Sequence, residues 1–331
     1  MTILVAPLNW GLGHASRCVP LIQRLLDEGN EVILGGDGES LTLLRKHFPR
    51  LRYTYLAPLN LRYSAGKSQV WAIVKALPAL IAWAIKDHAL LKGLLREEHI
   101  DQVISDNRFG LYSKDNQTQS VYITHQLHIM LPHGWRWLEP LASRLHARIC
   151  TRFNKVWVPD YEEVSQSLAG ELSHTNEQGT MYNVQYIGPL SRFDISKQQD
   201  VEIVKPYEVV AVLSGLEPQR TLLEKELIAR YTANPASVLI VQGLMNRPNT
   251  RIKRGKITIV PYMSDAELVP ALLGAKRIIA RSGYSTIMDL DALGLFNKAN
   301  CYIELLPTPG QPEQEYLAFW TQKRALTQKK C

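Results

Sequence analysis

The sequence predicts an α/β protein made of two doubly wound, Rossmann-like halves, and three observations support this class. Short runs of aliphatic and β-branched residues alternate with stretches of helical periodicity, as in βα units with parallel strands. The 331 residues exceed the roughly 150 of an ordinary domain. Apolar residues make up 46% and charged residues 21%, a globular composition that excludes disorder, collagen and coiled coil for the whole chain.

The first half alternates buried strands with helices. The apolar run Thr2–Pro7 is too short for a secretion signal and lacks a basic leader, so we expect it to be the first buried strand. Periodicity and β-branched content then predict helix 15–28, strand Glu31–Gly35, helix Glu39–His47, and strands at Asp101–Ser105, Val121–Thr124 and Val156–Pro159.

A polar, weakly patterned stretch at residues 191–207 separates the halves and predicts a linker. We therefore expect an N-terminal domain of residues 1–190 and a C-terminal domain of residues 208–331. The second half predicts strand Glu208–Leu213, helix Thr221–Tyr231, strands Ser237–Gln242, Ile257–Val260 and Arg277–Ala280, helix Thr286–Leu293 and strand Cys301–Glu304.

Positive charge is concentrated in one part of the chain. The formal net charge is +7, yet residues 45–96 hold ten basic side chains and one acidic one, for +9, which leaves −2 elsewhere. Residues 68–95 are apolar as well, with Trp71 and Trp83, which is typical of a helix lying on an anionic membrane. The alternative is a packed helical hairpin broken near Pro78. Nucleic acid is not expected, because no reading module is evident.

The four cysteines lie far apart and form no CxxC pair, so we expect neither a zinc site nor a disulfide framework. A reducing, cytoplasmic compartment fits this usage. With the basic stretch, the expected location is cytoplasmic, with peripheral attachment to the inner face of the cytoplasmic membrane. The sequence contains no uninterrupted run of about 18 apolar residues, so we expect no membrane span.

The loop after the first strand carries the first candidate site. Gly11 and Gly13 make a weak GxGxxS match to a dinucleotide fingerprint, for which Asp37 can serve as the ribose acid. His14 follows at a helix N-terminus, where the dipole disfavours the imidazolium and leaves a neutral ring that can accept a proton. The alternative is a histidine that only caps the turn.

Three loops of the second half follow strands and precede helices, where backbone amides bind anions. Ser214, Gly215 and Arg220 can bind phosphate, or form a plain turn. The loop from Arg281 to Thr286 makes a pyrophosphate cradle with Asp289 beside it for ribose, although capping by Ser285 or Thr286 explains part of the pattern. Around residue 312, amide and carboxylate side chains stand at the start of an expected helix. They can hydrogen-bond to sugar hydroxyls, or they can simply be a solvated helix start.

Taken together, these loops resemble the GT-B glycosyltransferases of family 28, the group that includes the bacterial enzyme adding N-acetylglucosamine to lipid-linked muropeptide. The resemblance covers the N-terminal glycine loop and most of residues 208–320. It implies the GT-B fold, in which two Rossmann-like domains face a cleft, with the acceptor on the first domain and the nucleotide sugar mainly on the second. It also implies inversion at the anomeric carbon without a metal.

The resemblance assigns roles to individual positions. His14 becomes the candidate general base, and Asp106, at the end of another strand, is expected to orient its ring. Asn107 and His125 fall on acceptor-side loops. The donor-binding set is Gly11, Gly13, Ser214, Gly215, Arg220, Arg281, Ser282, Gly283, Ser285, Thr286, Asp289, Gln311, Gln314 and Glu315.

Within that set, Arg281, Gly283 and Thr286 match an R-x-G-x-x-T loop that meets uracil and diphosphate. Asp289 stands where the muropeptide enzyme has a glutamate for the ribose. Gln314 and Glu315 match a Gln-Gln pair that holds the donor sugar. Relatives usually continue with more helix that crosses back to the first domain; here the last recognisable helix, Phe319–Cys331, is short, so we expect less support for cleft closure.

The predicted function is therefore an inverting, metal-independent transfer of a hexose or N-acetylhexosamine. It moves from a UDP-sugar to a hydroxyl of a glycan or lipid-linked acceptor, in cell envelope glycan biosynthesis. UDP-sugar is the co-substrate, and we expect no other cofactor. Two alternatives stay open. One is a nicotinamide or flavin oxidoreductase using Gly11, Gly13 and Asp37, which leaves the second half unexplained. The other is a catalytically dead sugar-nucleotide binding protein.

Overall fold

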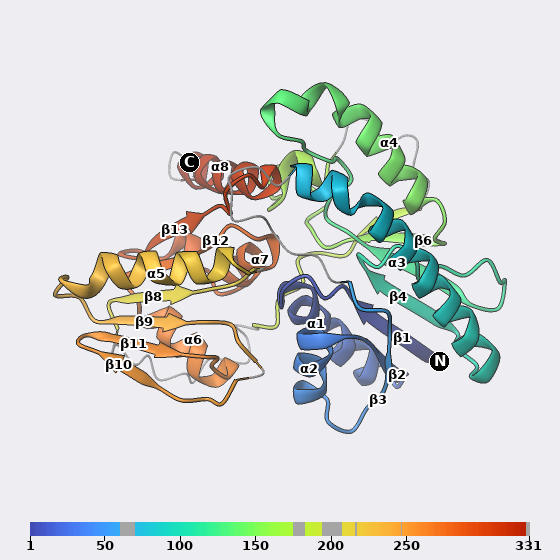
Figure 1. Cartoon of the computed structure of the whole chain (residues 1–331), viewed down its shortest axis with the longest axis horizontal. Helices are drawn as coiled ribbons and strands as arrows, with labels where there is room; N and C mark the ends of the chain where they lie inside the picture. Colours follow the sequence, from blue (N-terminus) through green and yellow to red (C-terminus); the bar gives the residue numbers. More distant parts are fainter. Residues whose placement is uncertain (60–69, 175–182, 194–206, 216, 246, 329–331) are drawn as a thin grey trace.

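The structure, a computed structural model, describes residues 1–331 except 60–69, 175–182, 194–206, 216, 246 and 329–331, and the side chains of 70–76 and 326–328. Each half builds one sheet flanked by helices, which confirms the predicted α/β class. Figure 1 shows the two halves side by side.

The first sheet has seven strands in the order β3-β2-β1-β4-β5-β6-β7, all parallel. Their bounds are β1 Thr2–Pro7, β2 Glu31–Gly36, β3 Arg52–Tyr55, β4 Gln102–Asp106, β5 Gln119–Ile123, β6 Lys155–Val158 and β7 Val184–Tyr186. β1 and β4 are neighbours, and Pro7 pairs with Asp106. The glycine loop after β1 and the carboxylate that ends β4 therefore lie at the same edge of the sheet.

Helices cover both faces of this sheet because alternate residues of β1 point to opposite sides. Ile3 and Val5 pack with α1 (Gly13–Asp27) and α2 (Gly38–His47), whereas Leu4 packs with α3 (Val70–Glu97). α4 (Glu139–Cys150) packs near β5 and β6 and follows the short 3₁₀ helix η1 (His133–Leu138).

α3 is one continuous helix of 28 residues that contains Pro78, so the expected hairpin break there is wrong. Its inner face carries Trp83, which is buried and donates its indole N–H to the carbonyl of Ala57 at 2.9 Å. Trp83 is therefore a core residue rather than a membrane anchor. Among the described residues, no helix is long and apolar enough to cross a membrane.

The second sheet has six strands in the order β10-β11-β9-β8-β12-β13, parallel except for β10. They are β8 Val209–Val212, β9 Val238–Val241, β10 Ile252–Arg254, β11 Ile257–Val260, β12 Arg277–Arg281 and β13 Tyr302–Leu306. The helices are α5 Gln219–Thr232, α6 Asp265–Gly274, α7 Tyr284–Ala292 and α8 Pro312–Gln328, with 3₁₀ turns η2 Gly170–Leu172 and η5 Leu295–Asn297. α5 packs on one face, and α6 and α7 on the other.

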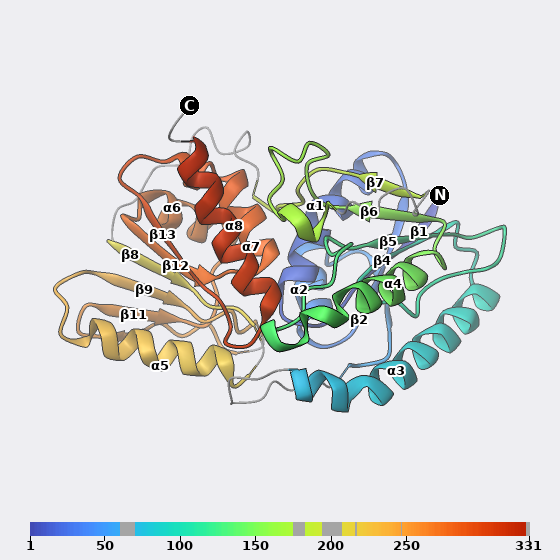
Figure 2. The ribbon, with the colours of Figure 1, turned by 90° about the horizontal axis from the view of Figure 1, so that it is seen from above.

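The two halves share a core. Leu168, Ala169 and Leu172 of the first half lie in one apolar cluster with α6 and α7. α8 begins at Pro312 and contacts the first half directly, because the Trp320 indole donates to the carbonyl of Ser167 at 3.0 Å. The last helix is therefore longer than the expected Phe319–Cys331 segment and does contact the first half. Figure 2 shows α8 running along the boundary between the halves.

Candidate active site

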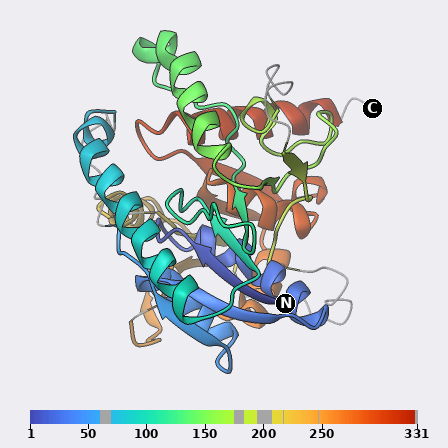
Figure 3. The same ribbon diagram turned by 90° about the vertical axis from the view of Figure 1, so that its right-hand side faces the viewer.

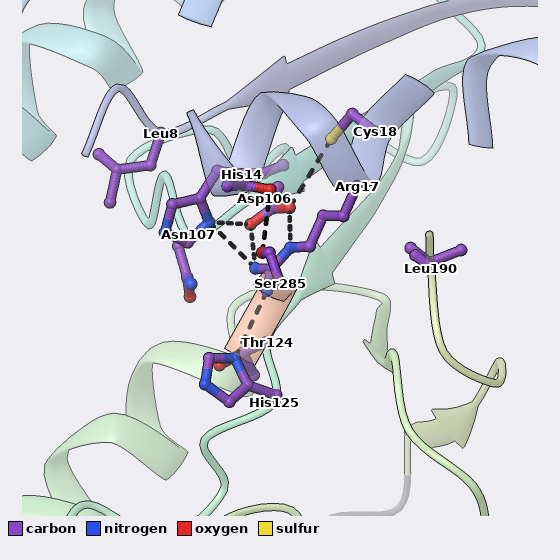
Figure 4. Close-up of polar contacts among 12 residues, drawn as sticks. Leu8, His14, Arg17, Cys18, Asp106, Asn107, Thr124, His125, Leu190 and Ser285 are labelled. Atoms are coloured by element: carbon purple, nitrogen blue, oxygen red, sulfur yellow. Dashed lines mark hydrogen bonds and ion pairs between the residues drawn. The ribbon is translucent and has the colours of Figure 1, made fainter. Parts of the chain in front are cut away.

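The edge where β1 and β4 end holds a buried cluster of charged side chains (Figure 4). His14 lies in the first turn of α1, and its Nδ1 is 2.7 Å from Oδ1 of Asp106. Asp106 is completely buried, whereas the His14 side chain is 18% exposed. The structure thus brings together the two residues that the sequence suggested as base and orienting carboxylate.

Arg17 completes this cluster, and sequence reasoning missed it. Its Nε donates to Oδ2 of Asp106 at 2.5 Å, and one of its terminal nitrogens donates to Oδ1. Arg17 is only 1% exposed although it sits on a helix. Its spacing of three residues from His14 places both on one helix face, and this was the only available signal.

Charge decides what the cluster can do. Burial on its own raises the pKa of the Asp106 carboxyl, but Arg17 and His14 outweigh it and hold that pKa well below its usual range. Burial lowers the pKa of His14 below the ordinary histidine value; the opposing attraction of Asp106 is offset in part by Arg17. His14 is therefore neutral near pH 7, and its Nδ1–H donates to the ionised Asp106. This tautomer leaves a lone pair on Nε2, the arrangement a general base needs.

His125 links this cluster to the second half. Its Nε2–H donates to Oε1 of Glu313 at 2.8 Å, and its Nδ1 lies 3.5 Å from a terminal nitrogen of Arg17. The ring stacks on Tyr284 of α7 with centroids 4.2 Å apart. Glu313 lies in the first turn of α8. The sequence analysis did not single it out, because the family resemblance pointed to Gln314 and Glu315, which follow it. Asn107, the other predicted acceptor-side residue, has a φ of 56° and accepts a hydrogen bond from Tyr122.

A cavity of about 1310 Å³ opens between the two halves beside this cluster. Eight of the predicted donor residues line it: Gly11, Gly13, Ser214, Gly215, Arg220, Ser285, Thr286 and Asp289. Asn9, Ser16, Glu39 and Tyr262 line it too, among residues that were not predicted. His14 is not a lining residue, although Gly13, which precedes it, and Ser16, two residues further on, are.

Two loops from opposite halves touch at the inner end of α1. The Ser285 hydroxyl donates to the carbonyl of Gly13 at 3.0 Å. A Cβ on Gly13 would lie 2.9 Å from that hydroxyl oxygen, so glycine is needed for this approach. Gly11 has a φ of 78°, a conformation that also favours glycine. The glycine loop is thus shaped by contact with the second half.

Several charged residues of the cavity are paired with other side chains of the protein. Arg220 pairs with Glu217 at 2.6 Å and with Glu224 at 2.9 Å, so its charge is balanced by two carboxylates. Burial raises the pKa of Asp289 to about 6, and its Oδ1 accepts a hydrogen bond from the Ser191 hydroxyl at 2.6 Å. Burial also raises the pKa of Glu39. The cavity therefore has no strong excess of positive charge among these groups.

Arg281 is not among the residues that line the cavity. It is 5% exposed, and its guanidinium donates to the carbonyls of Gln219 at 3.0 Å and Pro307 at 2.9 Å, in the loops that begin α5 and end β13. Its Nε is buried and makes no hydrogen bond within the described residues. The contact of Arg281 with the diphosphate stays a prediction.

The other predicted residues outside the cavity lining also belong mostly to this loop scaffold. The Ser282 hydroxyl donates to the carbonyl of Gln314, whose side-chain oxygen accepts from the amide of Thr308, both at 2.8 Å. The amide of Gln311 donates to the carbonyl of Thr308, and Glu315 is exposed. The predicted contacts of these side chains with the donor sugar stay a prediction. Gly283 caps α7 with open space where a Cβ would stand.

Asp37, the ribose acid of the oxidoreductase alternative, is paired with other side chains of the protein. Its carboxylate accepts from Arg108 at 2.8 Å and from the Asn9 amide at 2.9 Å. Arg108 is fully buried and also pairs with Asp87. This internal pairing does not favour the oxidoreductase. Among the described residues, no group of three His, Cys, Asp or Glu side chains is placed to hold a metal ion.

Comparison with known proteins points to one fold. No protein-family model matches the chain. An uncharacterized glycosyltransferase of Methanosarcina acetivorans is 24% identical over 339 residues, which cover 95% of this chain and 82% of that protein. A relative described in the same words, from Methanosarcina mazei, is 22% identical over 332 residues and covers the same shares.

Solved structures agree with these relatives. Arabidopsis thaliana UGT89C1, complexed with UDP-L-rhamnose, superposes with a TM-score of 0.57 at 14% identity, covering 99% of this chain and 92% of that one. CalG4, the calicheamicin glycosyltransferase, gives a TM-score of 0.58 at 11% identity over 96% and 83%. The chain therefore has the GT-B fold of glycosyltransferases, as the sequence predicted. The family 28 assignment stays a prediction.

Proposed function

We propose that this chain is an inverting glycosyltransferase that transfers a hexose or N-acetylhexosamine from a UDP-sugar to an acceptor hydroxyl. The observation that carries the proposal is the buried Arg17–Asp106 pair, which holds His14 as a neutral base in the same helical turn as Gly13 and Ser16, two residues that line the cavity between the two halves. A protein that only bound nucleotides would gain nothing from a base held in this tautomer.

The nucleotide part of the donor is proposed to bind on the second half. Ser285 and Thr286 line the cavity in the first turn of α7, where free backbone amides favour phosphate oxygens. Asp289 lies one turn further along the helix and offers a carboxylate to the ribose hydroxyls. One solved neighbour with the same fold was determined with UDP-L-rhamnose and another with UDP-2-fluoroglucose, which supports a uridine nucleotide.

The reaction is a single displacement. The acceptor oxygen forms a bond to the anomeric carbon while the bond from that carbon to the diphosphate oxygen breaks and UDP leaves. Nε2 of His14 takes the acceptor proton, and Asp106 stabilises the imidazolium that results. General base catalysis of this kind contributes about 10²–10⁴-fold. We propose that amides and hydroxyls at the start of α7 stabilise the leaving diphosphate without a metal.

The order and spacing of the loops supports the finer proposal of a family 28 type enzyme with a glycan or lipid-linked acceptor. On this proposal the protein acts in the cytoplasm, with the acceptor on the first half near Asn107 and His125. These two residues lie beside Asp106 and Arg17, respectively, which fits an acceptor approaching His14 from that side.

The donor site is tested by uridine diphosphate with a matched pair of glycine variants. Gly283 and Gly134 both have open space where a Cβ would stand, so we expect valine at either position to leave the unliganded fold intact. We expect uridine diphosphate to raise the melting temperature of the wild type and of Gly134→Val, but not of Gly283→Val, whose side chain blocks phosphate from the α7 amides. An equal rise for both variants would contradict the proposed phosphate position.

A further inference from the structure

Two neighbouring helices of the first half carry apolar side chains that face outward. On α3 they are Leu77, Ile81 and Ile85, and on η1 and α4 they are Trp137, Leu141 and Leu145. Each of the six is more than half exposed. Both sets repeat every four residues, so each forms a stripe along one side of its helix. We call these six residues the α3–α4 face.

These stripes are additional to the residues that hold the helices in place. α3 is anchored by the opposite side of the helix, where Trp83, Asp87 and Leu91 are buried. α4 is anchored by Ser143 and Cys150. The fold therefore does not need the exposed apolar residues to pack its own core, and exposed apolar patches of this kind mark interaction sites.

Both helices lie on the outside of the first half, away from the second half, as the views of the ribbon show (Figures 1, 2 and 3). In Figure 3, α4 stands at the top and α3 at the left edge of the molecule. The two helices thus belong to the outer surface of the same half.

The charged residues around the face are mostly basic. Lys86, Lys92 and Arg96 of α3 are exposed, as are Arg136, Arg144 and Arg148 of η1 and α4. Within the described part of the chain, none of these six takes part in an ion pair. Of the three acids of these segments, Asp87 pairs with Arg108 and Glu139 accepts from the amide of Leu131, whereas Glu97 is exposed beside Arg96. The α3–α4 face is thus apolar, flanked by six exposed cations against one exposed acid.

The remaining basic residues of the 45–96 stretch behave differently. Lys46 donates to the carbonyl of Met245 in the second half, and Arg52 pairs with Glu31 and Glu98. The charge excess seen in the sequence therefore does not form one surface. Among the described residues, its exposed cations are divided between Arg45 and Arg50, on or next to α2, and Lys86, Lys92 and Arg96 of α3. The basic residues of α4 are a further contribution that the sequence did not single out.

We propose that the α3–α4 face docks on the surface of an anionic lipid bilayer, with the six apolar side chains in the interface and the six cations at the headgroups. The partner must take up apolar side chains and supply negative charge, and an anionic membrane does both. A second copy of this chain is disfavoured, because it would bring its own six cations against these six. The inference does not depend on the proposed transfer activity.

The experiment is sedimentation with vesicles of phosphatidylcholine, with or without about 30% phosphatidylglycerol. Leu141→Ser/Arg144→Gln changes the face, and Leu222→Ser/Lys225→Gln makes the same changes, at the same spacing, on exposed residues of α5. We expect the wild type and the α5 variant to bind anionic vesicles alike. The α4 variant should bind at least about tenfold more weakly, and binding should fall as salt rises from about 0.05 M to about 0.5 M.

Trp137, which is 75% exposed, gives a local readout. The difference in emission between wild type and Trp137→Phe should shift to shorter wavelength when anionic vesicles are added. Equal vesicle binding by the α4 and α5 variants, or none by the wild type, would overturn the proposal. So would a concentration-dependent dimer in sedimentation velocity that the α4 variant alone disrupts, because the face would then be an interface between copies.

Discussion

The guanidinium of Arg17 is one of the groups that set the protonation of the proposed base. Arg17 lies 3.1 Å from Nδ1 of His14 and pairs with the carboxylate that holds the ring. Its charge opposes formation of the imidazolium, while the ionised Asp106 favours it. With burial as the largest influence, the balance keeps His14 neutral at physiological pH. The base is thus available without a separate deprotonation step.

His14→Gln removes the base while keeping a polar side chain of similar size. We expect kcat to fall by about 10²–10⁴-fold because the glutamine amide cannot replace Nε2 as proton acceptor. Uridine diphosphate should still raise the melting temperature, because His14 does not line the cavity. Transfer rates of the variant check the loss of the base, and melting curves of the same preparation check that uridine diphosphate still binds. Wild-type transfer rates in the variant would contradict the assignment.

The pH profile follows from the direction of the His14 pKa. Since burial lowers that pKa, transfer should lose rate only as the pH falls below the ordinary histidine value of about 6.5. Arg17→Gln removes a positive charge that lowers the pKa, so this acid limb should move to higher pH. Arg17→Lys keeps the charge and should move it less. The measurement is kcat/KM against pH, with circular dichroism to confirm folding, and an unmoved limb in Arg17→Gln would count against the electrostatic argument.

At the scale of elements, the site depends on how α8 meets the first half. Gly170 has a φ of 55°, and a Cβ there would lie 2.5 Å from the Tyr316 hydroxyl and 2.7 Å from the Trp320 ring. The chain of η2 thus lies directly against α8, whose first turn carries Glu313. Contact between η2 and α8 therefore fixes the side chain that reaches His125.

Gly170→Ala should destabilise the protein by about 2–4 kcal/mol, because backbone strain adds to the clash with α8. Gly188→Ala is the matched control: its φ of 74° gives the same kind of strain, but nothing lies within 4 Å of its Cβ position. The control should lose about 1 kcal/mol. Urea unfolding measures both, and equal losses would show that α8 does not press on η2 in solution.

Arg281 joins the loops that end β13 and begin α5 through main-chain carbonyls. Arg281→Met should therefore lower the melting temperature of the unliganded protein, because those buried carbonyls lose their donors. The rise in melting temperature caused by uridine diphosphate should persist in part. Calorimetric melting with and without the nucleotide separates the two effects. An unchanged unliganded protein that no longer responds to the nucleotide would instead support the predicted contact of Arg281 with the diphosphate.

Helices and strands with a clear apolar pattern were predictable from the sequence. Each of the others lacks that pattern for a physical reason. The buried runs of β1, β4 and β9 stand out because both faces of these strands are covered. β3 is largely exposed and β7 has three residues, so neither carries an apolar signal. α3 continues through Pro78, an exposed residue. Proline alone was a poor sign of a break there.

At the scale of the molecule, the two halves act as one frame for the site. A common apolar core holds η2 against α6 and α7, and the chain of contacts from Glu313 through His125 to Arg17 crosses the boundary. The loops at the strand ends were predictable, because parallel strands bring their carboxyl ends to one edge. Which side chains meet across the boundary depends on how the halves pack, so Glu313 and Arg17 could not be identified beforehand.

The most direct test of the central claim is proton NMR of the sugar released or transferred from α-linked UDP-sugars, recorded during turnover. With His14 as base and a single displacement, the first product must be the β-anomer, and His14→Gln must suppress its formation. An α-anomer as first product would contradict the displacement. Binding of uridine diphosphate without turnover of any UDP-sugar would instead indicate a sugar-nucleotide binding protein.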